Sequence, residues 1–172
     1  KQALAAWTKG NDLAKASADA ALAWAEQPGC RLMLLCDDDY PVMLTEGITP
    51  PPLLFLRGHT GLLHRPSVAV VGSRHATPQA LRIARDFGEA MAERGIAVVS
   101  GMAAGIDTAA HQGALAASDG HTVAVWGTGI DRIYPPSNKQ LAYQIAERGL
   151  VVSESPLDTR PLACNFPRRN RI

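Results

Sequence analysis

The residues best suited to chemistry form a turn between an apolar segment and a predicted helix, in the stretch VAVVGSRHATPQA at residues 68–80. Gly72, Ser73 and Arg74 make up the turn, and Thr77, followed by proline, is typical of a helix N-cap. A dinucleotide-binding turn would carry two further glycines at this place. This turn offers an arginine to a bound group instead.

Two interpretations of the turn remain open. Glycine lets a backbone approach a phosphate closely, and a helix N-terminus offers unpaired N–H groups to an anion, so nucleotide or nucleic-acid phosphate fits. The alternative is structural, because tight turns between strands and helices need glycine whatever they bind. Arg74 next to a positive helix end is unfavourable without an accompanying anion. Its own alternative partner is an acid such as Asp107 or Glu154.

Four apolar segments, rich in β-branched residues, predict the elements that position this turn. They lie near residues 68–71, 96–100, 122–126 and 150–153, with helical segments between them. Continuous apolar runs are typical of buried parallel strands, and right-handed crossovers would place helices on both faces of their sheet. Ser137 with Gln140 predicts a capping box at the third helix. The pattern predicts an α/β fold with a Rossmann-like, doubly wound and mostly parallel sheet.

The beginning of the chain has a different character. Residues 1–28 are alanine-rich with apolar positions at helical spacing, which predicts a helical segment that ends an N-terminal domain or forms a linker. Residues 29–172 are assigned to one extended Rossmann-like domain. Within it, RLMLLC at 31–36 and LLFLRG at 53–58 predict two further strands of the same sheet.

Composition narrows the function classes. With 172 residues and 47% hydrophobic content, the chain is long enough for one buried core. The net charge of +1 argues against a protein coated in positive potential, so any anion site is local. The sequence shows no membrane-spanning run and no signal-peptide pattern, which predicts a cytoplasmic protein without membrane insertion. The three cysteines lack metal-ligand spacing, and we expect neither a metal nor a cofactor.

In such a sheet, ligands bind at the carboxyl ends of the strands. The loops expected there are GSRHAT at 72–77, SGMAAGID at 100–107, GTGIDRIYPPSN at 127–138 and SESPLDTRPLACNFPRRNR at 153–171. Each loop directly follows an apolar strand and is rich in Gly, Ser, Asp or Arg. We therefore expect the functional residues to lie in these four loops.

Four linked motifs give the chain a resemblance to the DprA/Smf family of DNA-processing proteins. They are VAVVGSRHATP, VVSGMAAGIDTAAHQGAL, AVWGTGIDRIYPPSNKQLAYQI and VSESPLDTRP with NFPRRNRI, and they cover roughly residues 31–172. The resemblance implies a non-enzymatic protein of natural transformation that binds incoming single-stranded DNA and loads the recombinase RecA onto it. It also implies a homodimer in the full-length protein and a domain that continues beyond Ile172.

The resemblance implies DNA contacts in the same four loops. The residues concerned are Gly72, Ser73, Arg74, Gly101, Gly105, Asp107, Gly127, Gly129, Tyr134, Phe166, Arg168, Arg169, Asn170 and Arg171. The resemblance implies that Arg74, the arginine of the family's G-S/T-R turn, contacts DNA phosphate. Cys164 stands where the family usually has glycine, which leaves the course of the 160–167 loop open.

Other interpretations of these loops stand beside that one. Asp107 and His111 are four residues apart on one helix face, which suits an acid–base pair, but a helix-capping Asp and a hydrogen-bonded His are favoured. Tyr134 either stacks on a base or anchors its loop. The alternative function is a nucleotide-processing enzyme similar to the phosphoribohydrolases, although the P-G-G-x-G-T-x-x-E segment of those enzymes does not occur in this sequence.

Overall fold

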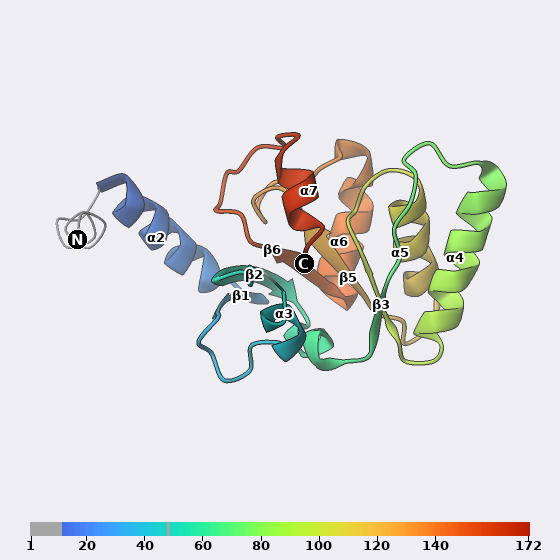
Figure 1. Cartoon of the computed structure of the whole chain (residues 1–172), viewed down its shortest axis with the longest axis horizontal. Coiled ribbons are helices and arrows are strands. Elements are labelled where there is room, and N and C mark those ends of the chain that lie inside the picture. The colour runs from blue at the N-terminus through green and yellow to red at the C-terminus, as the bar shows by residue number, and fades with distance from the viewer. Residues whose placement is uncertain (1–11, 48) are drawn as a thin grey trace.

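A six-stranded mixed sheet organises the computed structural model, which describes residues 12–47 and 49–172 (Figure 1). The strands are β1 (Cys30–Leu34), β2 (Leu53–Gly58), β3 (Ser67–Ala69), β4 (Ala97–Ser100), β5 (Thr122–Trp126) and β6 (Leu150–Ser153). Their order in the sheet is β1-β2-β6-β5-β4-β3. Strands β3 to β6 pair in parallel, and β1 and β2 join them as an antiparallel pair. The Rossmann-like, mostly parallel sheet predicted from the apolar runs is confirmed.

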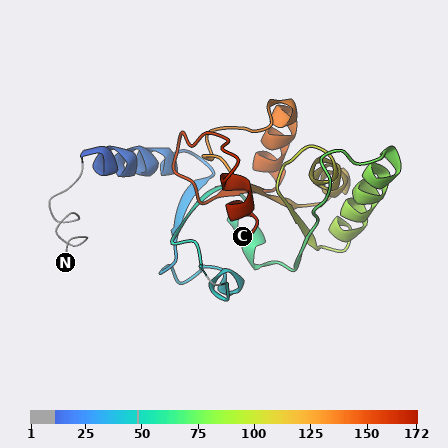
Figure 2. The ribbon, with the colours of Figure 1, turned by 45° about the horizontal axis from the view of Figure 1, so that its top comes forward.

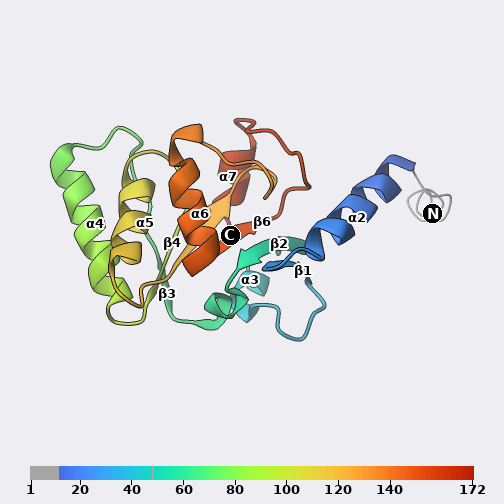
Figure 3. The ribbon, with the colours of Figure 1, turned by 180° about the vertical axis from the view of Figure 1, so that it is seen from behind.

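The helices do not cover the sheet as expected. They are α2 (Asp12–Ala25), α3 (Val42–Thr45), η1 (Thr60–His64), α4 (Pro78–Ala92), α5 (Ile106–Ala116), η2 (Pro136–Asn138), α6 (Lys139–Arg148) and α7 (Asn165–Arg169). Strands β3 to β6 are added in one direction, so right-handed crossovers place α4, α5 and α6 on the same face (Figure 3). The expectation that these crossovers cover both faces was wrong. No described helix has the length and apolar character needed to cross a membrane.

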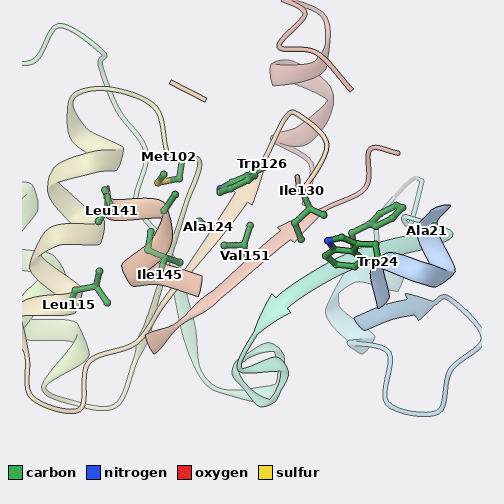
Figure 4. Close-up of a cluster of buried hydrophobic side chains, with 12 residues drawn as sticks. Ala21, Trp24, Met102, Leu115, Ala124, Trp126, Ile130, Leu141, Ile145 and Val151 are labelled. Carbon is green, nitrogen blue, oxygen red and sulfur yellow. The ribbon is translucent and has the colours of Figure 1, made fainter. Parts of the chain in front are cut away.

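The core lies on both sides of the sheet. On the face covered by α5 and α6, Ala124, Trp126 and Val151 pack into one apolar cluster (Figure 4). Trp24 of α2 extends this cluster, with its ring centroid 5.5 Å from that of Phe55. The opposite face has its own cluster, to which α3, η1 and the C-terminal residue contribute apolar side chains. Beyond this cluster, the opposite face carries the cavity described below.

The helix ends near the predicted site follow the sequence in one case and not in another. The Thr77 side chain accepts a hydrogen bond from the Ala80 N–H at 3.2 Å, which confirms the predicted N-cap of α4. The capping box predicted at Ser137 does not form, because a 3-10 turn precedes α6 and Asn138 is its N-cap residue. The Asn138 amide turns inward instead and donates to the Met102 carbonyl at 2.9 Å. The predicted division near residue 28 stays a prediction, and residues 1–11 of that segment lie outside the described residues.

Candidate functional site

A cavity of about 470 Å³ lies at the carboxyl ends of the parallel strands, between the turn at residues 72–74 and α7. Figure 2 shows α7 in front of the sheet. The cavity floor includes Ala69, Val99 and Val125, one from each of β3, β4 and β5. The cavity therefore occupies the edge of the sheet where the sequence predicts a ligand.

The turn that carries Arg74 is held by its neighbours. The Ser73 hydroxyl accepts a hydrogen bond from the His75 N–H at 3.1 Å, and the Ser73 carbonyl accepts one from the Ile106 N–H at 3.2 Å. Gly105 packs against the same turn with φ +85°, and a Cβ atom there would overlap the Ser73 carbonyl and the Arg74 backbone. The start of α5 thus fixes the position of Arg74.

The Arg74 side chain is placed against an aromatic ring rather than an acid. Its guanidinium carbon lies 5.4 Å from the centroid of the Phe166 ring, and Arg74 makes no ion pair with any described residue. The alternative of an ion pair with Asp107 or Glu154 is therefore wrong. Phe166 in turn lies 5.6 Å from the ring of Tyr134, which is 40% exposed. Arg74 and Phe166 line the cavity, and the ring of Tyr134 adjoins Phe166.

Arg169 occupies a different environment from the surface contact expected of it. The residue is 8% exposed, and its Nη1 donates to the carbonyls of Gly101 at 2.6 Å and Val125 at 2.5 Å. Its Nε donates to the Asn170 side chain at 2.9 Å. Burial lowers the pKa of Arg169, the charge of Asp107 opposes that change, and the charge of Arg74 adds to it. Arg169 joins α7 to β5 and to the residue that follows β4 through these hydrogen bonds, and little of its surface is accessible to a ligand.

The two other arginines of the C-terminal segment share one carboxylate. Arg168 lies 3.3 Å from Glu154, and Arg171 pairs with the other oxygen of the same carboxylate. Arg171 also donates to the Thr49 carbonyl at 2.6 Å. The Glu154 side chain is 7% exposed, whereas the side chain of Arg168 is 71% exposed. Of these two arginines, Arg168 has the more exposed side chain, whereas Arg171, at 27% exposed, lines the cavity.

Asp107 and His111 do not form an acid–base pair. Asp107 accepts hydrogen bonds from the N–H groups of Gly101 at 3.1 Å and Ala103 at 3.3 Å. His111 lies 2.7 Å from the Thr122 hydroxyl, which donates its own hydrogen to a backbone carbonyl. His Nδ1 must therefore carry the hydrogen in that contact. Burial, together with the charge of Arg169, lowers the pKa of His111 from 6.5 to about 3. The hydrogen-bonded His111 is confirmed. The prediction that Asp107 caps the helix was wrong, because Gly105 is the N-cap residue of α5 and Asp107 binds N–H groups of the loop that precedes the helix.

The predicted glycines make room for protein groups. A Cβ atom on Gly101 would overlap the Arg169 guanidinium, and one on Gly127 would lie 2.9 Å from the Phe166 ring. The same holds for Gly72, against the Ile106 side chain, and for Gly129, against the backbone of the 156–158 segment. These glycines therefore allow α7 and the loops to close around the cavity, and their assignment to phosphate contacts stays a prediction without direct geometric support.

Two residues, Asn138 and Asp131, hold the loops of the site in place through contacts that the sequence does not predict. The Asn138 amide reaches Thr108 at 2.8 Å in addition to Met102, and so ties α6 to the loop that precedes α5. Asp131 accepts two hydrogen bonds from the Asp158 N–H, at 2.9 and 3.0 Å, and ties two of the four loops together. Asn138 is a residue type that favours helix N-termini, and Asp131 belongs to the GTGIDRIYPPSN loop, but neither pattern predicts these contacts.

The three consecutive aspartates at residues 37–39 take no part in this site. Arg31 donates to Asp39 at 2.6 Å and holds the pKa of that carboxyl below its usual range. Asp37 accepts a hydrogen bond from the Leu34 N–H at 2.9 Å. Within residues 12–47 and 49–172, no three His, Cys, Asp or Glu side chains gather as metal ligands do.

The fold and the site together define a Rossmann-like α/β protein with a basic and aromatic cavity at the carboxyl edge of its sheet. A sequence profile of the family described as DNA recombination-mediator protein A matches residues 31–172. The chain belongs to this family.

Individual relatives agree with this assignment. The protein Smf of Synechocystis is 46% identical over 142 residues, which are 79% of this chain and 35% of that protein. The X-ray structure of DNA processing protein A (DprA) from Streptococcus pneumoniae superposes with a TM-score of 0.79 at 42% identity, over 89% of this chain and 53% of that one. A structure of DNA processing protein A from Helicobacter pylori, described as giving insights into its unique single-stranded DNA binding mode, superposes with a TM-score of 0.74 at 30% identity. It matches 82% of this chain and 62% of that one. The chain thus spans between a third and a half of the curated relatives' length.

Proposed function

We propose that the cavity between the 72–74 turn and α7 binds the backbone of single-stranded DNA. The observation that carries this proposal is Arg74, which makes no ion pair with any described residue and lies against Phe166 at the mouth of the cavity. An exposed guanidinium presents a planar fork that suits phosphate oxygens. The rings of Phe166 and Tyr134 supply faces on which unpaired bases stack, as in proteins that bind single strands without sequence preference.

The wider role rests on the family. The Helicobacter pylori relative is described by its single-stranded DNA binding mode, and we extend that binding to this chain. We further propose that the full-length protein is a cytoplasmic homodimer that processes incoming DNA in natural transformation and loads RecA onto it.

The serines that follow the strands favour a binding protein over an enzyme. Ser100 donates its hydroxyl to the Val70 carbonyl at 2.6 Å, and Ser153 donates to the Thr128 carbonyl at 2.7 Å. The Ser73 hydroxyl is occupied by the N–H of His75. A nucleophilic serine needs a general base within hydrogen-bond reach, and these contacts engage each hydroxyl with backbone groups. We therefore propose that the chain has no catalytic turnover.

The experiment measures the affinity for single-stranded and double-stranded oligonucleotides at several salt concentrations. Three or four phosphate contacts predict a slope of roughly −2 to −3 in a plot of log affinity against log salt, at about 0.7 per contact. We expect single strands to bind more tightly and base sequence to matter little. A flat salt response would contradict the proposal. Release of free base from nucleoside monophosphates would support the phosphoribohydrolase-like alternative instead.

A further inference from the structure

Two hollows lie on the face of the sheet that α4, α5 and α6 cover (Figure 3). One, of about 330 Å³, opens between α4 and α5, and the other, of about 430 Å³, opens between α5 and α6. Arg85 and Gln112 line both, so the hollows adjoin. We call the pair the helical groove. Its polar lining includes Arg82, Arg85, Gln112, Gln140, Gln144 and Arg148, and no acidic side chain of residues 12–47 and 49–172 lines either hollow.

The helical groove begins directly behind the turn that carries Arg74. Gly105 lines the hollow between α4 and α5, and the same glycine lies against the backbone of Ser73 and Arg74. A nucleic-acid strand that passes Arg74 and crosses the edge of the sheet would therefore reach the groove at Gly105. The groove and the cavity thus lie on opposite sides of the loops that hold Arg74 and Gly105.

Two cations in the groove are free to meet an anion. Arg82 and Arg85 are exposed, and neither makes an ion pair within the described part of the chain. They lie three residues apart, which places them on one side of α4 in its first two turns. Asp86 and Glu89 each lie four residues after one of these arginines, yet no ion pair forms with them.

Arg148, at the far end of the groove, differs from these two. Its guanidinium donates to the carbonyls of Leu115 at 2.9 Å and Ala117 at 3.1 Å, at the C-terminal end of α5. Arg148 is thus engaged by the protein, and the free positive charge of the groove comes from Arg82 and Arg85.

We propose that the helical groove is a second nucleic-acid-binding surface, which receives the backbone of the same single strand after it passes Arg74. This inference rests on the proposed function of the cavity. Arginine and glutamine side chains are common partners of phosphate and sugar, and such contacts carry no sequence information. No aromatic side chain from the described part of the chain lines the groove, so the groove holds phosphates without stacking bases. Its contribution must therefore depend on the length of the strand.

The test compares two labelled oligothymidines, of about 5 and about 20 nucleotides, by fluorescence anisotropy. The variant is Arg82→Ala/Arg85→Ala. The matched control is Arg65→Ala/Arg94→Ala, which also removes two exposed positive charges but at residues outside the groove. We expect the groove variant to bind the long strand about five- to tenfold more weakly than the control does, and its salt slope to fall by about 1.4. For the short strand, the two variants should agree within about twofold.

The outcomes separate this inference from the proposed function. If the unmodified chain binds neither strand, the proposed function fails. If it binds both strands and the groove variant matches the control for the long strand, the groove inference fails and the cavity stands. The inference also fails if the groove variant weakens both strands equally, because the groove would then act only through the general field of the protein. A thermal melt of each variant checks that the fold is kept.

Discussion

The turn at residues 72–77 and the C-terminal segment at 165–171 both carry arginines that the sequence assigns to DNA, but the structure uses them differently. Arg74 in the turn has an aromatic neighbour and, among the residues that the structure describes, no acidic ion-pair partner. In the C-terminal segment, Arg169 is buried against two carbonyls, and Arg168 and Arg171 share the carboxylate of Glu154. The C-terminal segment thus builds one wall of the cavity, whereas the turn offers the charge. The presence of arginine in a motif does not show whether its charge is available.

This difference has a physical consequence for substitutions. A buried guanidinium that satisfies carbonyls contributes to folding, because its removal leaves buried acceptors without donors. An exposed guanidinium contributes little to folding and can contribute much to binding an anion. Substitutions in the two regions should therefore separate into losses of stability and losses of affinity.

The largest effect is expected for Arg169→Ala. The carbonyls of Gly101 and Val125 would each lose a charged donor, so the free energy of unfolding should fall by about 3 kcal/mol or more. Chemical denaturation measures this change. Arg168→Ala is the matched control from the same helix, and its effect should stay within about 0.5 kcal/mol because its side chain is exposed. If Arg169→Ala and the unmodified chain unfold at the same denaturant concentration, Arg169 does not stabilise the fold, and the proposed difference between the two regions is wrong.

The next effect is a dependence of stability on pH, which we expect from His111, a buried residue whose pKa is affected by the charge of Arg169. Because the pKa of His111 is about 3 in the folded state and 6.5 in the unfolded state, the unfolded state binds more protons between these values. Stability is therefore fully present above pH 6.5 and falls as the pH decreases, by up to about 1.4 kcal/mol per unit. At pH 4.5 the loss should approach about 3 kcal/mol.

Urea denaturation at pH 7 and pH 4.5 measures the pH effect. His111→Gln should reduce the difference between the two pH values, and His75→Gln, a change at an exposed histidine, should keep it. An unchanged pH dependence in His111→Gln would show that other groups cause it. A titration of His111 in folded Arg169→Ala links this effect to the first prediction. Loss of the Arg169 charge should raise the pKa of His111.

A smaller effect is expected where α5 supports the turn. Gly105→Ala forces a side chain into φ +85° and against the Ser73 carbonyl, which should cost about 1 to 3 kcal/mol and shift Arg74. Gly95→Ala is the matched control, because φ is +74° there but nothing lies within 4 Å of the added Cβ. Both variants should melt at lower temperature, and only Gly105→Ala should also bind single-stranded DNA more weakly. Equal affinities would mean that the position of Arg74 does not depend on Gly105.

Particular residues show how far the sequence predicts this fold and site. The parallel strands and the cap at Thr77 follow from local patterns, which suffice because apolar runs and cap residues act over short distances. The face occupied by α4 to α6 depends on strand order, which no local pattern contains. The burial of Arg169 depends on Gly101 and Val125, which are 68 and 44 residues away in the chain. The five-residue helix α7 was expected as part of a loop, because its proline and paired arginines carry no helical periodicity.

The central claim is that Arg74 holds a DNA phosphate. Its most direct test is fluorescence anisotropy of a labelled single-stranded oligonucleotide with Arg74→Ala and Arg74→Lys, paired with a thermal melt of each variant. We expect Arg74→Ala to weaken binding by about 1 to 3 kcal/mol at an unchanged melting temperature, as for a charge-assisted hydrogen bond. Arg74→Lys should recover only part of that loss, because an ammonium lacks the planar fork. If Arg74→Ala binds like the unmodified chain, or if its melting temperature falls together with its affinity, Arg74 is a structural residue and the claim is wrong.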